Sequence, residues 1–276
     1  MPGRWRSVCV GSPREAGGLA NRRRITVDAD VVWDDVVDVV CTDAGYAGMI
    51  CAIATSEHGG DVMIAGQQRR TRMWFDSLRG DPATTAYVAE LAGDIDLKRL
   101  PADEEALPVR TAQAYREPST NKRRRTVPAF DGGRLRRWAA SCIASPTGYL
   151  YTRVTDWPSE TVQSADGDLL EVYAPDLGAT SADAGVLAGL TAQARNHRVH
   201  VHPVDAVSRL VFEDNTVAGV VFATADGPLA IRARHGVLVC GGAPAGDDVP
   251  LAAGLRPALV GRTASRFGRV ELLSAQ

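Results

Sequence analysis

A glycine-rich turn between an apolar strand and a helix of small residues is the part of this sequence best suited to chemistry. The turn reads Asp43-Ala44-Gly45-Tyr46-Ala47-Gly48. In such a turn, glycines let the main chain approach a pyrophosphate, and the amides at the N-terminus of the following helix hold its charge. The spacing therefore predicts a dinucleotide site. The predicted phosphate-lining residues are Asp43, Ala44, Gly45, Ala47 and Gly48.

Two positions depart from the usual dinucleotide fingerprint. Asp43 replaces the first glycine, which adds a side chain where the turn is tightest and a negative charge close to two phosphates. Gly66 stands where an acidic residue would bind the ribose hydroxyls. Both changes oppose nucleotide binding. Asp43 has two other roles open to it, as a general base or as a cap of the following helix, and the frequency of aspartate at caps favours the second.

Other chemically capable residues are weaker candidates. His200 and His202 share one face of a predicted strand, close to His197, a geometry that suits a metal ion. No cysteine or carboxylate beside them completes a site, which favours exposed or edge-strand histidines. Cys240 follows a wholly apolar strand, which favours a buried structural cysteine over a reactive thiol. We therefore assign no metal site and no catalytic residue from the sequence.

The elements that must position the turn follow from the apolar pattern. Val36–Thr42 is a nearly continuous β-branched run, which is typical of a strand buried on both faces of a parallel sheet. Met49–Glu57 predicts a helix, and Val62–Ala65 a second parallel strand. Since Val237–Cys240 is also a short apolar run that ends in a glycine turn, we expect these three strands to be parallel neighbours in one sheet.

The rest of the chain gives a mixed pattern. Asp81 followed by Pro82 is a strong helix start, since aspartate caps and proline suits the first helical position. The other expected elements are helices at 84–92, 133–144 and 182–197, a strand at 199–202, an antiparallel meander of strands at 206–213, 217–223 and 229–234, and loops at 101–117.

Composition excludes several classes of protein. The chain has 276 residues, 45% apolar and 23% charged, which is typical of a folded globular protein. A formal charge of −2 gives no overall field for nucleic acid or membrane surfaces. The segment Lys122–Arg137 has a local excess of positive charge, but it lacks interleaved aromatic residues, so a solvated basic face is favoured over a nucleic-acid patch.

Targeting and redox signals point to the cytoplasm. Five widely spaced cysteines without a CxxC pair favour reduced thiols, and no apolar run is long enough to span a membrane. Residues 1–30 are rich in arginine, glycine and proline without a period. We interpret them as a disordered basic tail, and an over-extended reading frame would give the same pattern.

These features together resemble a known family. The glycine turn, the small-residue helix, the late meander and the strand that ends in Cys240-Gly241-Gly242 are similar to the FAD-binding domain of fumarate reductase, succinate dehydrogenase and 3-ketosteroid dehydrogenase flavoproteins, over about residues 33–245. The resemblance implies an α/β, Rossmann-like fold with a parallel sheet, crossover helices and an antiparallel β-meander. It implies that FAD is the cofactor. It also implies that Cys240, Gly241 and Gly242 stand for the family's Thr-Gly-Gly turn and that the main chain near Val207 contacts the adenine.

The resemblance also bears on activity. Residues 31–276 would form the FAD-type domain, with an irregular insertion at about 67–180. Family members carry a capping domain and a returning segment after the Gly-Gly strand, whereas 34 residues follow Gly242 here, so we expect the catalytic half to be absent. The leading hypothesis is a flavin-dependent oxidoreductase-like protein with weakened FAD binding. The alternatives are a non-catalytic interaction or structural protein and, more distantly, a nucleic-acid binder. A protein partner or oligomer would supply the missing contacts.

Overall fold

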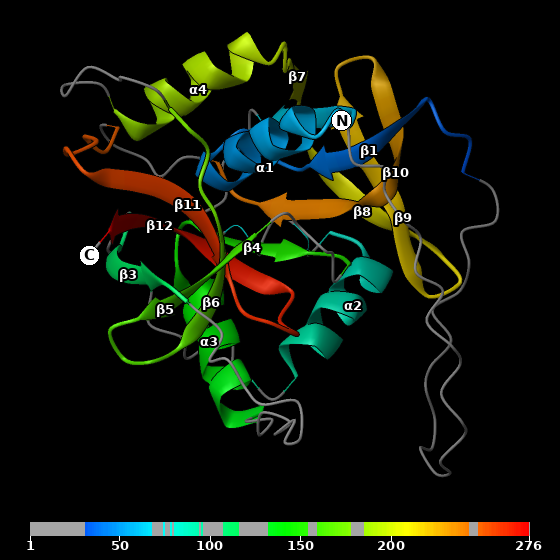
Figure 1. Cartoon of the computed structure of the whole chain (residues 1–276). Helices are drawn as coiled ribbons and strands as arrows, with labels where there is room; N and C mark the ends of the chain where they lie inside the picture. Colours follow the sequence, from blue (N-terminus) through cyan, green and yellow to red (C-terminus); the bar gives the residue numbers. More distant parts are fainter. Residues whose placement is uncertain are drawn as a thin grey trace, which may run out of the picture.

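The computed structural model describes the chain in blocks around one large mixed sheet (Figure 1). The described residues are 31–67, 74, 78, 80–93, 95, 107–115, 132–153, 159–177, 185–242 and 248–275. The expected tail at 1–30, the basic run at 122–131 and the first residues of the helix expected at 182–197 lie outside them.

Helices and strands alternate irregularly along the chain. The helices in the described blocks are α1 (Tyr46–Glu57), α2 (Pro82–Ala92), α3 (Gly132–Ala144) and α4 (Val186–Asn196). The first six strands are β1 (Asp35–Cys41), β2 (Val62–Gln67), β3 (Val109–Ala114), β4 (Gly148–Tyr151), β5 (Glu160–Ser164) and β6 (Leu169–Tyr173). The others are β7 (Val201–Val204), β8 (Ala206–Glu213), β9 (Thr216–Thr224), β10 (Gly227–Cys240), β11 (Leu255–Gly261) and β12 (Phe267–Ala275).

The parallel centre of the sheet agrees with the sequence prediction. β1 lies between β10 and β2 and is parallel to both, with Val40 opposite Val237 and Met63. β7 extends the parallel set beyond β2. The three strands predicted to be parallel neighbours are thus confirmed, and their carboxyl ends lie along one edge of the sheet.

One strand serves two parts of the sheet. The sequence suggested separate strands at 229–234 and 237–240, but β10 runs without a break through both. Its first half pairs antiparallel with β9, which pairs with β8, so the predicted meander is present. Gly236 allows the continuation, because its φ of 153° is one that residues with side chains rarely adopt and a Cβ there would lie 2.9 Å from the Tyr151 ring.

The far side of the sheet closes into a ring. β11, β6, β5, β3 and β12 pair in that order, and β12 pairs again with β11. β3 lies inside the segment 101–117, which was expected to be loops, so that expectation is wrong for 109–114. The strand was missed because its residues are only partly buried and do not alternate between apolar and polar.

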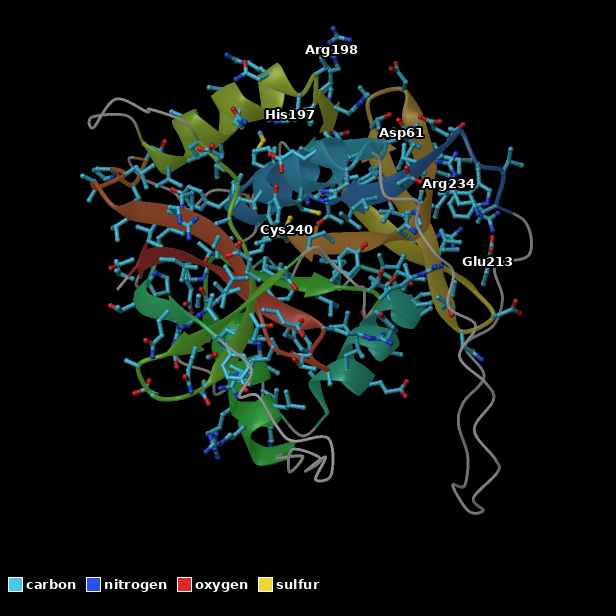
Figure 2. The ribbon with its side chains drawn as sticks, viewed as in Figure 1. Asp61, His197, Arg198, Glu213, Arg234 and Cys240 are labelled. Atoms are coloured by element: carbon cyan, nitrogen blue, oxygen red, sulfur yellow. The ribbon has the colours of Figure 1, made fainter. Side chains whose placement is uncertain are left out.

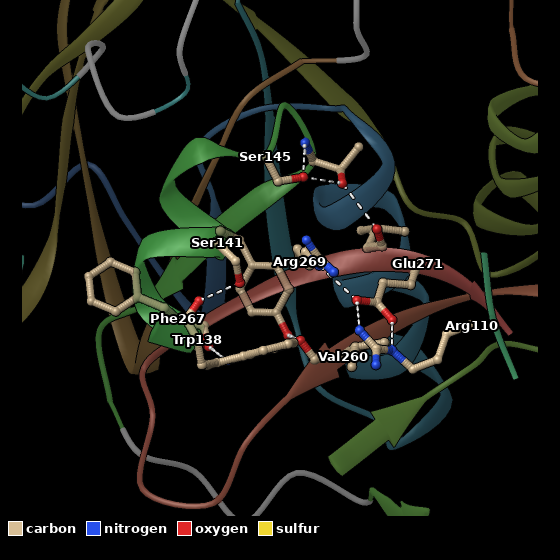
Figure 3. Close-up of polar contacts among 11 residues, drawn as sticks. Arg110, Trp138, Ser141, Ser145, Val260, Phe267, Arg269 and Glu271 are labelled. Carbon is tan, nitrogen blue, oxygen red and sulfur yellow. Dashed lines mark hydrogen bonds and ion pairs between the residues drawn. The ribbon is translucent and has the colours of Figure 1, made fainter. Parts of the chain in front are cut away.

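A buried ion-pair group lies beside this ring (Figure 3). The carboxylate of Glu271, on β12, is fully buried. It accepts hydrogen bonds from Nη2 of Arg110 at 2.9 Å and from Nε of Arg269 at 2.7 Å, and Nε of Arg110 also contacts it. Two guanidinium groups therefore compensate one buried charge, which is the condition under which such a group is tolerated.

Helices cover both faces of the sheet. In Figure 1, α1 and α4 lie above it and α2 and α3 lie below. One cluster of buried side chains joins α2 and α3 to the lower face, and another joins α1 and α4 to the upper face. The capping prediction for α2 is confirmed, because Asp81 accepts the amide of Thr84 at 2.7 Å and Pro82 begins the helix. None of the described helices is long and apolar enough to cross a membrane.

Candidate functional site

The carboxyl ends of β1 and β10 are joined by a side chain. The hydroxyl of Thr42 accepts the amide of Cys240 at 3.0 Å and donates to the Cys240 carbonyl at 3.1 Å. The residues that follow, Asp43 on one side and Gly241-Gly242 on the other, are therefore neighbours. The structure thus brings together the two predicted halves of the site, residues 43–48 and 240–242.

The N-terminus of α1 is buried, and no side chain of the described residues caps it. Gly45 is the N-cap residue in an extended conformation, and its carbonyl accepts the amide of Met49 at 3.0 Å. Tyr46, Ala47 and Gly48 form the first turn and are all buried. Asp43 instead accepts the amide of Ala44 at 2.7 Å, so the prediction that Asp43 caps this helix is wrong. The first amides of α1 have no partner within the helix and point toward the space in front of its N-terminus.

Gly48 sets how closely α1 approaches the sheet. A Cβ at this position would lie 1.9 Å from the main-chain oxygen of Asp43 and 3.5 Å from Sγ of Cys240. No side chain fits at the first of these distances. The third glycine of the motif is therefore needed for helix-to-strand packing, as in dinucleotide-binding turns.

The space before the Gly-Gly turn is taken by the chain's own side chains. A Cβ on Gly242 would lie 3.2 and 3.3 Å from the two carboxylate oxygens of Asp43, which is itself 8% exposed. A Cβ on Gly241 would lie 2.8 Å from Cβ of the buried Trp74. Both glycines thus give room to protein groups, one of them negatively charged.

The β2 end of the site lacks a carboxylate. Gly66 lies beside β7, where its own Cβ would be 2.7 Å from Cγ1 of Val201. Val207 lies just beyond, since Val204 at the end of β7 pairs with Gln67 at the end of β2 and β8 starts two residues later. Gly66 and Val207 therefore lie toward the same sheet edge as the glycine turn, although the structure records no contact between them.

A contact that the sequence did not reveal holds the glycine turn. Tyr46 donates its hydroxyl to Oδ1 of Asp248 at 3.2 Å, and the same carboxylate accepts the amides of Leu187 and Ala188 at 2.9 Å each. Asp248 thus binds the N-terminus of α4 and anchors the turn to it. No local signal marks this role, because Asp248 lies 61 positions from Leu187 in the chain.

The remaining candidates show no reactive arrangement. Cys240 is buried, and that burial, together with the nearby charge of Asp43, raises the pKa of its thiol well above the usual value, in keeping with a structural cysteine. His200 and His202 are exposed, with His202 on β7, and no cluster of three metal-ligating side chains occurs in the described blocks. Arg134, Arg136 and Arg137 are exposed on α3.

The family comparison agrees with this geometry. Residues 38–266 match the model of a family described as the FAD binding domain, which covers most of the chain, from within β1 to beyond the end of β11. The chain belongs to the FAD-binding domain family. Its fold is the flavoprotein α/β fold, and FAD is the cofactor of the family. A search of curated proteins finds no sequence that matches.

Solved flavoproteins are distant from this FAD-binding domain. A 3-ketosteroid-Δ4-(5α)-dehydrogenase from Rhodococcus jostii RHA1 is 19% identical over 78% of this chain and 47% of its own, with a TM-score of 0.32. A flavocytochrome c3 fumarate reductase is 15% identical over 73% of this chain and 33% of its own, with a TM-score of 0.30. The chain thus spans less than half the length of either structure.

Proposed function

We propose that this domain binds FAD at the carboxyl edge of β1 and β10, with weaker affinity than the family fingerprint would give, and that it serves a flavin-dependent oxidoreductase. The observation that carries the proposal is the buried, uncapped N-terminus of α1 beside the Gly-Gly turn. Amides in that position favour an anion such as a pyrophosphate. Bound flavin supplies the acceptor of a hydride, and the protein supplies position and electrostatics.

Particular residues would hold the cofactor. The amides of the first turn of α1, around Ala47 and Gly48, would face the phosphates, and Gly45, as the N-cap residue without a side chain, would let them approach the main chain. Near the end of β2, Gly66 and the main chain near Val207 border the nucleoside half. The donor set therefore fits the phosphates, while the ribose would meet no carboxylate at Gly66.

Two features lead us to expect weakened affinity for FAD: a carboxylate near the phosphates and no carboxylate near the ribose. Asp43 is buried beside Gly242, and a carboxylate there opposes a pyrophosphate by about 1–4 kcal/mol at the effective dielectric of a partly buried site. The missing ribose carboxylate removes hydrogen bonds worth about 1.5–3 kcal/mol. Each 1.4 kcal/mol is a factor of ten in affinity, so the two effects together would weaken FAD binding by about 60-fold or more.

The side chains packed against Gly241 and Gly242 favour a second function. Asp43 lies against Gly242 and Trp74 against Gly241, so protein groups pack against both glycines of the turn. That packing supports a domain of flavoprotein descent that has lost its cofactor and acts through interactions. A partner chain that supplies contacts to FAD would make the FAD-binding function and the interaction function compatible.

A titration of FAD into the purified chain separates these functions. Quenching of flavin fluorescence measures the affinity of the unchanged protein, of Asp43→Asn and of Asp43→Gly with Gly66→Glu. We expect Asp43→Asn to bind FAD about tenfold more tightly than the unchanged protein, and the double variant more tightly still. Asp226→Asn, which removes one carboxylate from the exposed β9–β10 turn, is the matched control and should change nothing.

The outcomes are distinct. A yellow protein that purifies with one FAD per chain would refute the weakening and leave the enzyme function. Absence of quenching in all three proteins would favour the non-catalytic function. In the double variant, Val201 is 43% exposed, so its side chain has room to turn away from the carboxylate that Gly66→Glu introduces, and far-ultraviolet circular dichroism checks that the fold is kept.

A further inference from the structure

A polar cavity of about 730 Å³ lies at the opposite edge of the sheet from the FAD site. It is bounded by α2, the β8–β9 turn, the first half of β10 and the residues after β4. In Figure 2, Arg234 and Glu213, which line it, lie far along the sheet from Cys240, which marks the carboxyl end of β10. The cavity is therefore separate from the FAD site.

The lining of this cavity carries excess positive charge. Four arginines face two acidic residues; the lining charges are Arg153, Arg232, Arg234, Arg266, Glu213 and Asp214. Arg232 is paired with Glu213 at 2.6 Å, and Arg234 with Asp38 at 3.1 Å. The charges of these two arginines are thus compensated, which leaves Arg153, Arg266 and Asp214, a net charge of one positive, to determine the charge of the interior.

Arg153 and Arg266 have no carboxylate partner in the described part of the chain. Arg153 donates through Nη1 to the carbonyl of Arg234 at 3.0 Å, and its Nε is buried without any hydrogen-bond acceptor. Arg266 donates through Nη1 to the hydroxyl of Tyr87 at 3.1 Å. A guanidinium has five N–H donors, so most donors of both side chains are available. The Nη donors of the two side chains beyond these hydrogen bonds are the ones from which an anion in the cavity would accept.

The two arginines come from neighbouring segments. The amide of Tyr151, two residues before Arg153, donates to the carbonyl of Arg266 at 2.8 Å. Both residues also line a second, smaller cavity of about 210 Å³. Guanidinium groups from two segments offer donors in different planes, which suits the tetrahedral oxygens of a phosphate.

We propose that Arg153 and Arg266 bind the phosphate of a small hydroxylated metabolite, of the sugar-phosphate class, in this cavity. The rest of the lining suits such a ligand. Thr152, Thr216, Asn215 and Asp214 provide hydroxyl, amide and carboxylate groups that hydrogen-bond sugar hydroxyls. The volume accommodates a hexose phosphate within the range of ordinary small-molecule sites.

Isothermal titration calorimetry on the full chain tests the proposal, with glucose 6-phosphate, glucose, glucuronate and inorganic phosphate as probes. We expect glucose 6-phosphate to bind one per chain, more tightly than inorganic phosphate, and glucose alone not to bind. Arg153→Gln and Arg266→Gln should each weaken binding by about 10- to 100-fold, which corresponds to one charge-assisted hydrogen-bond set. Binding should also weaken as salt rises.

Two controls make the test specific. Arg195→Gln removes an exposed arginine from α4 and should leave binding unchanged, and so should Asp43→Asn at the FAD site. Arg153→Lys keeps the charge but not the forked guanidinium donors, so it should bind more weakly than the unchanged protein even when its circular dichroism is native. Three results would overturn the proposal. Arg153→Gln could bind glucose 6-phosphate as tightly as the unchanged protein does, or glucuronate could bind more tightly than glucose 6-phosphate. The third result is that glucose 6-phosphate does not bind at about 10 mM.

Discussion

The side-chain amide of Gln67, the last residue of β2, donates to the main-chain oxygen of Thr42 at 2.8 Å. Thr42 is the residue before Asp43, so this bond ties the end of β2 to the start of the glycine turn. A polar side chain next to Gly66, where the ribose is expected, is therefore bonded to the protein itself. Asp43 likewise lies against Gly242. The domain therefore keeps the shape of a nucleotide site, but some of the polar side chains around it contact the protein.

We predict that Gly48→Ala destabilises the domain by about 1–3 kcal/mol, because a methyl group would overlap the carbonyl of Asp43 at 1.9 Å. Urea unfolding followed by circular dichroism measures the change. Gly80→Ala is the matched control, since its nearest atom is the Ser208 carbonyl oxygen at 3.9 Å. An equal stability of the two variants would show that α1 shifts to accept the methyl group without cost.

Glu271→Gln should lower the free energy of unfolding by about 3–5 kcal/mol, because it leaves Arg110 and Arg269 without the carboxylate that compensates them. Glu160→Gln on the exposed face of β5 should change stability by less than about 0.5 kcal/mol. Thermal unfolding of both variants compares the two positions. A small loss in Glu271→Gln would mean that the guanidinium groups find solvent instead.

The carboxylate of Asp38 should make the protein more stable above pH 4 than below it. Burial favours the neutral acid, but the amide of Asp61 and the guanidinium of Arg234 outweigh it and hold the pKa of Asp38 below its usual value. A lowered folded-state pKa gives stability that is present above the unfolded pKa of about 4 and lost as pH falls through the folded value.

Asp38→Asn should therefore reduce the loss of stability between about pH 4 and pH 3, by less than about 1 kcal/mol because Arg234 is half exposed. Urea midpoints measured across this range give the slope. A steeper acid loss in the variant than in the unchanged protein would contradict the stated direction.

The four described cysteines should not react with a thiol reagent in the native protein. All are buried, and burial raises the pKa of Cys41, Cys142 and Cys240 well above the usual thiol value. In a Cys9→Ser background, Ellman's reagent at pH 8 should modify no thiol before urea is added and four thiols afterwards. Rapid modification of the native chain would identify an opened site at Cys240 or one of its neighbours.

The sequence predicted the parallel centre of the fold because its strands are continuous apolar runs that end in glycine turns. It could not predict β3, whose residues do not alternate, or the continuity of β10 across Gly236. At the site, the spacing of the glycine-rich turn alone predicted the positions of the glycines. The roles of Asp43 and Asp248 were not, because each depends on a partner about 60 to 200 positions away, as the 61 positions between Asp248 and Leu187 illustrate.

The contact between Thr42 and Cys240 joins residues 198 positions apart, and this separation bears on the order of folding. Contacts of such high sequence separation form late, because a long loop must close before they add any stability. On the ribosome, β1 and α1 emerge long before β10 does, so the glycine turn must wait for its second half with apolar surface exposed. The nucleotide cradle is therefore complete only after β10 has emerged and paired with β1.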